Sequence, residues 1–149
     1  MVTLKNVIAT VSSILLNNFP QINIQSTDIK EGFEQPSFYV ELDNFKTNLL
    51  NKWHKKYKVS IRIYYFPKDT YKNQIELLEM QEILSDLFLK GIWVENTSFF
   101  IYKTEDDLDF TVTDGVLQLQ FYLNYVQTIE EEDTTELMEE LDVNTTINK

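Results

Sequence analysis

Residues 55–66 read Lys-Lys-Tyr-Lys-Val-Ser-Ile-Arg-Ile-Tyr-Tyr-Phe, and this stretch decides the fold. Its side chains alternate between apolar or aromatic groups and polar or basic ones. A period of two is typical of a β-strand with one buried face. The pattern therefore predicts that one face buries Tyr57, Val59, Ile61, Ile63 and Tyr65. The other face carries Lys56, Lys58 and Arg62, and we expect it to meet solvent or a partner.

The same alternation returns near the end of the chain and predicts a hairpin. Residues 116–127 carry apolar or aromatic side chains at every second position, and Asp114-Gly115 separates them from a shorter strand at residues 109–113. A two-residue Asp-Gly loop favours a type I′ turn, which joins antiparallel strands. Further short strands are predicted at residues 22–25, 37–42, 92–95 and 98–103.

Two amphipathic helices are predicted from apolar residues spaced three and four apart. The first runs from residue 4 to about residue 18, with Thr3 as its N-cap, and ends before Pro20. The second runs from about residue 71 to residue 89, with Asp69 or Thr70 as its cap and Gly91 in the place of a left-handed C-terminal cap. The expected core stripe of the second helix comprises Leu77, Met80, Ile83, Leu84, Leu87 and Phe88.

A second apolar cluster belongs to a different side of the same helix. It comprises Tyr71, Ile75, Leu78 and Leu89. A subunit with one sheet face to cover does not need both clusters. Two explanations stay open: either the helix is well buried between a sheet and a loop, or the cluster makes an intermolecular contact.

The element order is α, β, β, β, α, β, β, β, β, which indicates an α+β fold. We expect a mostly antiparallel sheet with two main helices packed on one face. The length of 149 residues, with 43% hydrophobic side chains, fits one domain, and the sequence has neither an internal repeat nor an interdomain linker. Residues 1–129 are assigned to a single α+β domain, and residues 130–149 to an acidic C-terminal tail or docking arm.

The net charge of −11 is distributed unevenly. Residues 130–149 hold eight carboxylates against Lys149, a net −7, whereas residues 45–72 hold eight cations against Asp69, a net +7. This balance argues against general affinity for duplex DNA and suits a protein that meets copies of itself through complementary patches. A basic patch for nucleic acid is the minor alternative.

The acidic tail also contains apolar positions, Leu137, Met138, Leu141 and Val143, which are spaced as in half a helix or a docking peptide. A tail that is disordered and only solvates the protein is the other interpretation, because most of its residues are charged or polar.

Residue types that support catalysis or metal binding are scarce. The chain has no cysteine and a single histidine, His54, so neither a zinc site rich in Cys and His nor a Ser-His-Asp triad is expected. No glycine-rich phosphate loop and no nucleophile elbow is present. The longest apolar stretch, residues 7–16, is shorter than the ~20 residues of a membrane span and lacks a following cleavage site. We therefore expect an intracellular, non-enzymatic protein without cofactor, metal or membrane contact.

Several segments, taken in their order and spacing, resemble one known family. They are Asn18-Phe19-Pro20, residues 29–40 (IKEGFEQPSFYV), residues 63–67 (IYYFP), residues 114–117 (DGVL) and residues 137–144 (LMEELDVN). Nearly end to end, the chain resembles the small tail terminator proteins of long-tailed phages and phage-like elements of Firmicutes. The resemblance implies an α+β subunit that forms a hexameric ring on the last ring of the tail tube, stops tube polymerisation and offers the surface to which the head connector binds. It transfers no individual site residue, because no short motif defines the interfaces of the family.

The residues themselves supply the candidates for subunit or partner contact: Lys56, Lys58, Arg62, Tyr71, Ile75, Leu78, Leu137, Met138 and Leu141. The expected partners are copies of the chain, the tail tube protein, the head–tail connector or neck protein, and the tail sheath where the tail has one. DNA would pass through the ring lumen without sequence-specific binding. The expected location is the neck end of the virion tail, assembled in the host bacterial cytoplasm. Two alternatives stay open: another neck or head-completion protein, and a cytoplasmic adaptor module whose acidic tail binds a partner.

Overall fold

Three long antiparallel strands form the centre of the sheet. In the computed structural model they are β2 (Ser37–Leu49), β3 (His54–Phe66) and β7 (Val116–Thr128). β1 (Asn23–Gln25) pairs in parallel with β2, and β6 (Asp109–Thr113) pairs antiparallel with β7, so the strand order is β1-β2-β3-β7-β6. The structure describes residues 2–25, 36–69, 71–103 and 107–129.

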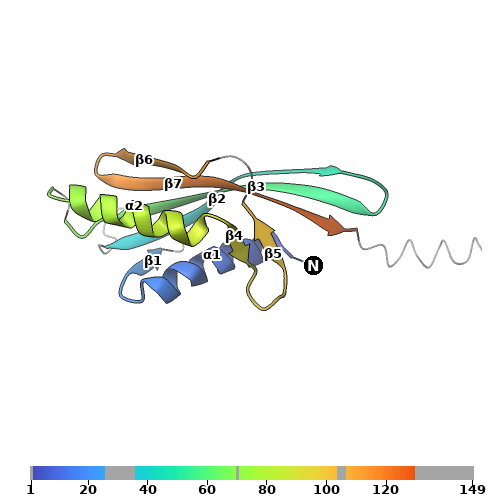
Figure 1. Ribbon diagram of the computed structural model, residues 1–149, viewed down its shortest axis with the longest axis horizontal. Helices are drawn as coiled ribbons and strands as arrows, with labels where there is room; N and C mark the ends of the chain where they lie inside the picture. Colours follow the sequence, from blue (N-terminus) through green and yellow to red (C-terminus); the bar gives the residue numbers. More distant parts are fainter. Residues whose placement is uncertain (1, 26–35, 70, 104–106, 130–149) are drawn as a thin grey trace, which may run out of the picture.

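Both helices and a small antiparallel ribbon lie on the same side of this sheet (Figure 1). The helices are α1 (Leu4–Asn18) and α2 (Gln74–Phe88), and the ribbon consists of β4 (Gly91–Trp93) and β5 (Phe100–Tyr102). We call the covered side of the sheet the inner face and the opposite side the outer face. The predicted α+β fold, mostly antiparallel with two main helices on one face, is confirmed.

The inner face of β3 is the one that the alternation predicted. Its five predicted core residues are all buried. Ile61 lies opposite Phe121 of β7, and the Phe121 ring stacks on Phe88 of α2 with 5.2 Å between ring centroids. The burial of such side chains supplies most of the free energy that holds helix and sheet together. The core therefore lies between the inner face and the two helices.

The helix α1 begins and ends as predicted. The Thr3 hydroxyl accepts a hydrogen bond from the Asn6 amide (3.1 Å), and the Asn6 side-chain oxygen accepts one from the Thr3 amide (2.9 Å). This reciprocal capping box satisfies two backbone donors that helix geometry leaves without partners. The helix ends at Asn18, two residues before Pro20.

The helix α2 begins three residues later than predicted, at Gln74. The Asp69 carboxylate accepts hydrogen bonds from the amides of Lys72 (3.0 Å) and Tyr71 (2.9 Å), and these bonds lower the pKa of Asp69 below its ordinary value. Asp69 thus closes a turn ahead of the helix, so the prediction that it caps the helix is wrong. The other proposed cap, Thr70, lies outside the described residues.

Two further details of this region differ from the sequence-based expectation. Ile83 is exposed, because the buried stripe of α2 is narrower than predicted and comprises Leu77, Met80, Leu84 and Phe88. Gly91 has a φ of +132° and starts β4 instead of forming a left-handed cap. A Cβ on Gly91 would lie 2.0 Å from the carbonyl oxygen of Ile101, so the glycine permits the close approach of β5.

The hairpin between β6 and β7 forms as predicted. Asp114 and Gly115 both have positive φ, at 53° and 76°, which is the geometry of a type I′ turn. The ribbon β4–β5 was also expected as a pair of short strands, and its strands are each three residues long.

The strand β2 continues seven residues beyond its predicted end at Leu42. The register passes from Leu42 opposite Ile61 to Asn44 opposite Ser60, so Asp43 is an extra residue that forms a β-bulge. Beyond the bulge β2 and β3 extend past the helices, together with the end of β7 (Figure 1). We call residues 43–58 and 124–128 the arm, and the remaining described residues the body.

Candidate interaction surfaces

The outer face of the sheet carries its polar residues in rows that cross β2, β3 and β7. One row consists of Lys46, Lys58 and Asn124, which are paired across the three strands. The row nearer the arm tip contains Lys56, and a row in the body contains Arg62. The prediction that Lys56, Lys58 and Arg62 share one face is therefore confirmed by the register of the strands. Lys46 joins them because the bulge at Asp43 reverses the alternation of β2.

The charge of Arg62 is matched by carboxylates of the same face. Its guanidinium lies 3.2 Å from the Asp43 carboxylate and 3.6 Å from that of Glu41. A hydrogen bond to the Tyr64 hydroxyl, together with the nearby carboxylates of Asp43 and Glu41, raises the pKa of Arg62 above its ordinary value. Arg62 is therefore held as a local structural cation, and its two partner carboxylates reduce the positive charge that it presents to another molecule.

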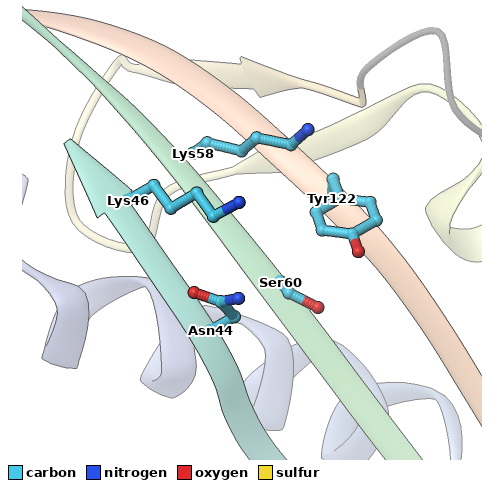
Figure 2. Close-up of a pocket in the computed structure, with 5 residues that line it drawn as sticks. All are labelled: Asn44, Lys46, Lys58, Ser60 and Tyr122. Atoms are coloured by element: carbon cyan, nitrogen blue, oxygen red, sulfur yellow. The ribbon is translucent and has the colours of Figure 1, made fainter. Parts of the chain in front are cut away.

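The row of Lys46 and Lys58 borders a small pocket of about 60 Å³, which we call the lysine pocket. Figure 2 shows the two lysine side chains next to each other, with Asn44, Ser60 and Tyr122 completing the wall. The Lys58 ammonium lies 4.7 Å from the centre of the Tyr122 ring, a cation–π contact. The volume of the pocket is far smaller than the volume of a typical small-molecule site, which is about 300–1,000 Å³. The pocket therefore has room only for a single small group, and its lysines favour an anionic one.

The depression around the lysine pocket continues in two directions. Toward the arm tip it is lined by Lys46, Thr47, Asn48, Lys56 and Lys58. Toward β6 it includes the carboxylates Asp107 and Asp109, beside Lys58 and Tyr122. The positive side chains therefore gather on the arm, and negative side chains border them on the side of the body.

The second apolar cluster of the α2 region is exposed. Tyr71 retains 94% of its accessible surface, Ile75 72% and Leu78 53%, and Leu89 is exposed as well. The explanation that a loop buries this cluster within one subunit is therefore wrong for these four residues. Tyr71 lies in the turn before α2, while Ile75 and Leu78 lie on the helix itself. Whether they contact another subunit stays a prediction.

The remaining predicted contact residues, Leu137, Met138 and Leu141, lie outside the described residues, as does the whole acidic tail. The division of the chain at residue 129 stays a prediction too. Among the described residues, the buried core extends from Val2 to Tyr125.

Sequence reasoning missed two exposed apolar groups. Leu49, Leu50 and Trp53 lie at the arm tip, and Leu49 retains 70% of its accessible surface. Trp93 and Tyr102 are exposed on the β4–β5 ribbon. The signal for the arm tip was present as the alternation of Phe45, Thr47 and Leu49 with the polar Lys46 and Asn48, but the bulge puts this alternation out of phase with the residues before it.

Within residues 2–25, 36–69, 71–103 and 107–129, no three His, Cys, Asp or Glu side chains come together as metal ligands would. His54 is half-buried, and its ring nitrogen Nδ1 lies 3.1 Å from the side-chain oxygen of Asn51 in the turn at the arm tip. No described helix has the length and apolar character needed to cross a membrane, since α1 and α2 each have 15 residues.

Comparison with known proteins agrees with the resemblance found in the sequence. Residues 6–136 match the family described as phage tail terminator protein. A search of curated protein sequences finds no match to the chain. The family match spans all of α1 except its first two residues, all of α2, every described strand and the first residues of the acidic tail. The chain therefore belongs to the phage tail terminator family, and its role is that of a structural component of the virion tail.

Proposed function

We propose that this protein forms a hexameric ring that caps the tail tube, stops its polymerisation and provides the surface for joining the head. Membership of the phage tail terminator family, over residues 6–136, is the observation that carries the proposal. In this role the protein is a structural subunit and not an enzyme, and it needs no cofactor.

The distribution of exposed apolar side chains supports self-association. A ring is built from heterologous contacts, in which one patch of a subunit meets a different patch of its neighbour. The chain has at least two such patches: one on the α2 region with Tyr71, Ile75 and Leu78, and one at the arm tip with Leu49 and Trp53. Apolar groups of this size are exposed to water in the single subunit, and their burial would favour assembly.

The proposed partners follow from this position in the virion. They are other copies of the chain, the tail tube protein, the head–tail connector or neck protein, and the tail sheath where there is one. The protein would occupy the neck end of the tail and assemble in the cytoplasm of the host bacterium. DNA would pass through the lumen of the ring without sequence-specific contacts.

Deletion of the gene from the phage genome tests the proposal. An uncapped tube can continue to accept subunits, so we expect tails of variable length that lack heads, seen by negative-stain electron microscopy. Supply of the protein from a plasmid should restore tails of uniform length with heads. Uniform, head-bearing tails in the deletion mutant would contradict the proposal.

Electron microscopy also distinguishes the two alternatives. Another neck or head-completion protein would share the ring but leave tube length uniform when deleted, because the tube end would still be capped. A cytoplasmic adaptor would be missing from purified virions altogether. A sixfold ring of this protein on isolated tail ends would contradict both alternatives.

A further inference from the structure

We propose that the inner face of the arm tip packs against the outward side of α2 in a neighbouring copy of the same chain. The contact joins the exposed side chains of Phe45, Leu49 and Trp53 in one subunit to those of Ile75 and Leu78 in the next. The proposal rests on the ring proposed above and specifies which surfaces of its subunits meet.

The inner face of the sheet continues along the arm, beyond the two helices that cover it in the body (Figure 1). Leu49 of β2 pairs with Lys55 of β3, and Phe45 pairs with the buried Val59, so these side chains lie on the inner face. Trp53 lies in the turn between the same strands and retains 63% of its accessible surface. The arm tip is therefore an apolar part of the face on which helices pack in the body.

The helix α2 has an exposed side that is roughly opposite its buried stripe. Successive residues of a helix are about 100° apart, so the side chains that point away from the sheet follow from the positions of the buried ones. This outward side comprises five exposed residues: Ile75, Leu78, Glu79, Glu82 and Asp86. It therefore combines two apolar side chains with a row of three carboxylates.

The charges of the two surfaces select α2 of another copy as the partner of the arm tip. Residues 45–56 contain four lysines and no carboxylate, a net +4, whereas α2 contains four carboxylates and no cation, a net −4. Lys55 lies beside Leu49 on the inner face, and Glu79 follows Leu78 on the outward side. Opposite charges would therefore surround the apolar contact. Contact between two arms, or between two copies of α2, would instead bring like charges together.

The two surfaces lie at opposite ends of the subunit. The helix α2 begins at the end of the body that is remote from the arm tip (Figure 1), and its buried stripe holds it on its own sheet. One subunit therefore cannot bring its own α2 to its own arm. Unlike surfaces that meet between copies form a heterologous contact, and its repetition by a constant rotation closes a ring. Each subunit gives its arm to one neighbour and receives the arm of the other.

Charge reversal in full-length chains tests which surfaces meet. The arm variant carries Lys52→Glu and Lys55→Glu, and the helix variant carries Glu79→Lys and Glu82→Lys. Each is added alone to tail tubes that lack a terminator, and capped ends are counted by electron microscopy. At low salt we expect each variant to cap about tenfold less than the unaltered protein, because every arm then faces a helix of like charge. A variant that caps normally on its own would overturn the proposal.

An equal mixture of the two variants distinguishes a contact between copies from a contact with the tube. When the variants alternate in a ring, each reversed arm meets a reversed helix and each native arm meets a native helix. We therefore expect the mixture to regain capping. If both variants fail alone and the mixture fails as well, the arm binds another component, such as the tube protein, and the proposal is wrong.

Cross-linking between introduced cysteines gives a readout that does not depend on capping efficiency. The chain has no cysteine, so Leu49→Cys and Leu78→Cys in one chain provide its only two thiols. A short bismaleimide should join them between subunits, both in solution and on tubes, and give a ladder of covalent oligomers that ends at the size of the ring. Chains with either substitution alone should stay monomeric. Dimers of the single variants, or a double variant that gives no ladder, would contradict the proposed contact.

A matched control separates this contact from general charge effects. Lys5→Glu with Lys90→Glu makes the same charge change as the arm variant at two exposed positions of the body, and should cap normally. An equal loss in this control would assign the effect to net charge and overturn the proposal. Thermal unfolding checks that every variant is folded.

The same measurements separate this contact from the proposed function. If the unaltered protein does not cap tubes while the cysteine ladder forms, the proposed function fails and the contact stands. If the unaltered protein caps tubes while the reversals have no effect and no ladder forms, only the present inference fails.

Discussion

The two halves of the long strands share one alternation but have different surroundings. In the body, the inner face of β3 and β7 is covered by α1 and α2, and Ile61, Leu119 and Phe121 are fully buried. In the arm these strands continue past the helices together with β2, and Phe45 and Leu49 of β2 are exposed. One sequence pattern therefore has two structural outcomes, which depend on what covers the strand.

In the arm, aromatic side chains and the N-terminal segment bury part of the inner face in place of a helix. Tyr57 stacks on Tyr125 with 5.0 Å between ring centroids, and Phe45 stacks on Tyr57 at 5.4 Å. The side chain of Gln127 forms two hydrogen bonds with the backbone of Val2, which ties the N-terminal segment across the end of β7. Aromatic pairs and this clamp replace a helix. The body is therefore stabilised by contacts within one subunit, whereas the apolar side chains of the arm tip are exposed to solvent.

The largest expected effect is the difference in stability between a truncated core side chain in the body and a truncated side chain at the arm tip. Phe121→Ala removes a fully buried ring that stacks on Phe88, and we expect the free energy of unfolding to fall by about 3–5 kcal/mol. Leu49→Ala at the arm tip should change it by less than about 0.5 kcal/mol, because Leu49 is already exposed. Urea denaturation followed by circular dichroism measures both. Equal losses for the two variants would contradict the division into body and arm.

The clamp between the N-terminal segment and the arm should give the next largest effect. Gln127→Ala removes both hydrogen bonds to Val2, of 2.7 and 2.9 Å, and leaves two backbone groups without their buried partner. We expect a loss of about 2 kcal/mol in the free energy of unfolding. Faster hydrogen exchange of the first residues of the chain should accompany the loss. Gln118→Ala, on the outer face of the body, is the control and should have little effect on either measurement.

One buried tyrosine in each half allows the body and the arm to be compared through a smaller expected change in stability. In the body, the Tyr65 hydroxyl donates a hydrogen bond to Glu76 of α2, whereas in the arm the Tyr125 hydroxyl has no partner among the described residues. Tyr65→Phe should cost about 1.5 kcal/mol, the lower end for a bond to a charged group, since Glu76 keeps its bond from the Lys68 amide. Tyr125→Phe should leave the stability unchanged or raise it slightly. A larger loss for Tyr125→Phe would contradict this account.

The raised pKa of Tyr125 in the arm should make the free energy of unfolding depend on pH in the alkaline range. Burial, and to a lesser extent the nearby Tyr57, raises the pKa of Tyr125 to about 12, whereas an unfolded chain has a tyrosine pKa of about 10. A raised pKa in the folded state means that the stabilising contribution is complete below pH 10 and is lost as the pH rises toward 12. Unfolding free energies measured between pH 9 and pH 12 should therefore fall less steeply for Tyr125→Phe than for the unaltered protein.

The body could be predicted from the sequence because its signals are local. The alternation of residues 55–66, which continues from the arm into the body, the Thr3 cap and the Asp114-Gly115 turn each act within a few residues, and each is confirmed. The arm could not be predicted in full, because the bulge at Asp43 inserts one residue and reverses which side chains of β2 face inward. A prediction that assumes a strict period of two therefore ends the strand at the bulge.

The candidate surfaces could be predicted only where they depend on the alternation of side chains between the two faces of a strand. This alternation correctly placed Lys56, Lys58 and Arg62 on one face. The pairing of Arg62 with Glu41 and Asp43 depends on the register between β2 and β3, and no periodicity within a single strand contains that information. The exposure of the arm tip likewise depends on where the helices end relative to the sheet.

The smallest expected effect on stability comes from removal of the acidic tail. Most residues of the segment 130–149 are charged or polar, so truncation after Ile129 should leave the free energy of unfolding within about 0.5 kcal/mol of its full-length value. Assembly should respond differently, because exposed ion pairs contribute only about 0–1 kcal/mol each and set orientation, while the apolar Leu137, Met138 and Leu141 would supply the holding energy. Leu141→Asp should therefore weaken tube capping nearly as much as truncation does. Truncated protein that caps tubes and joins heads as well as the full chain, at both low and high salt, would show that the tail is passive.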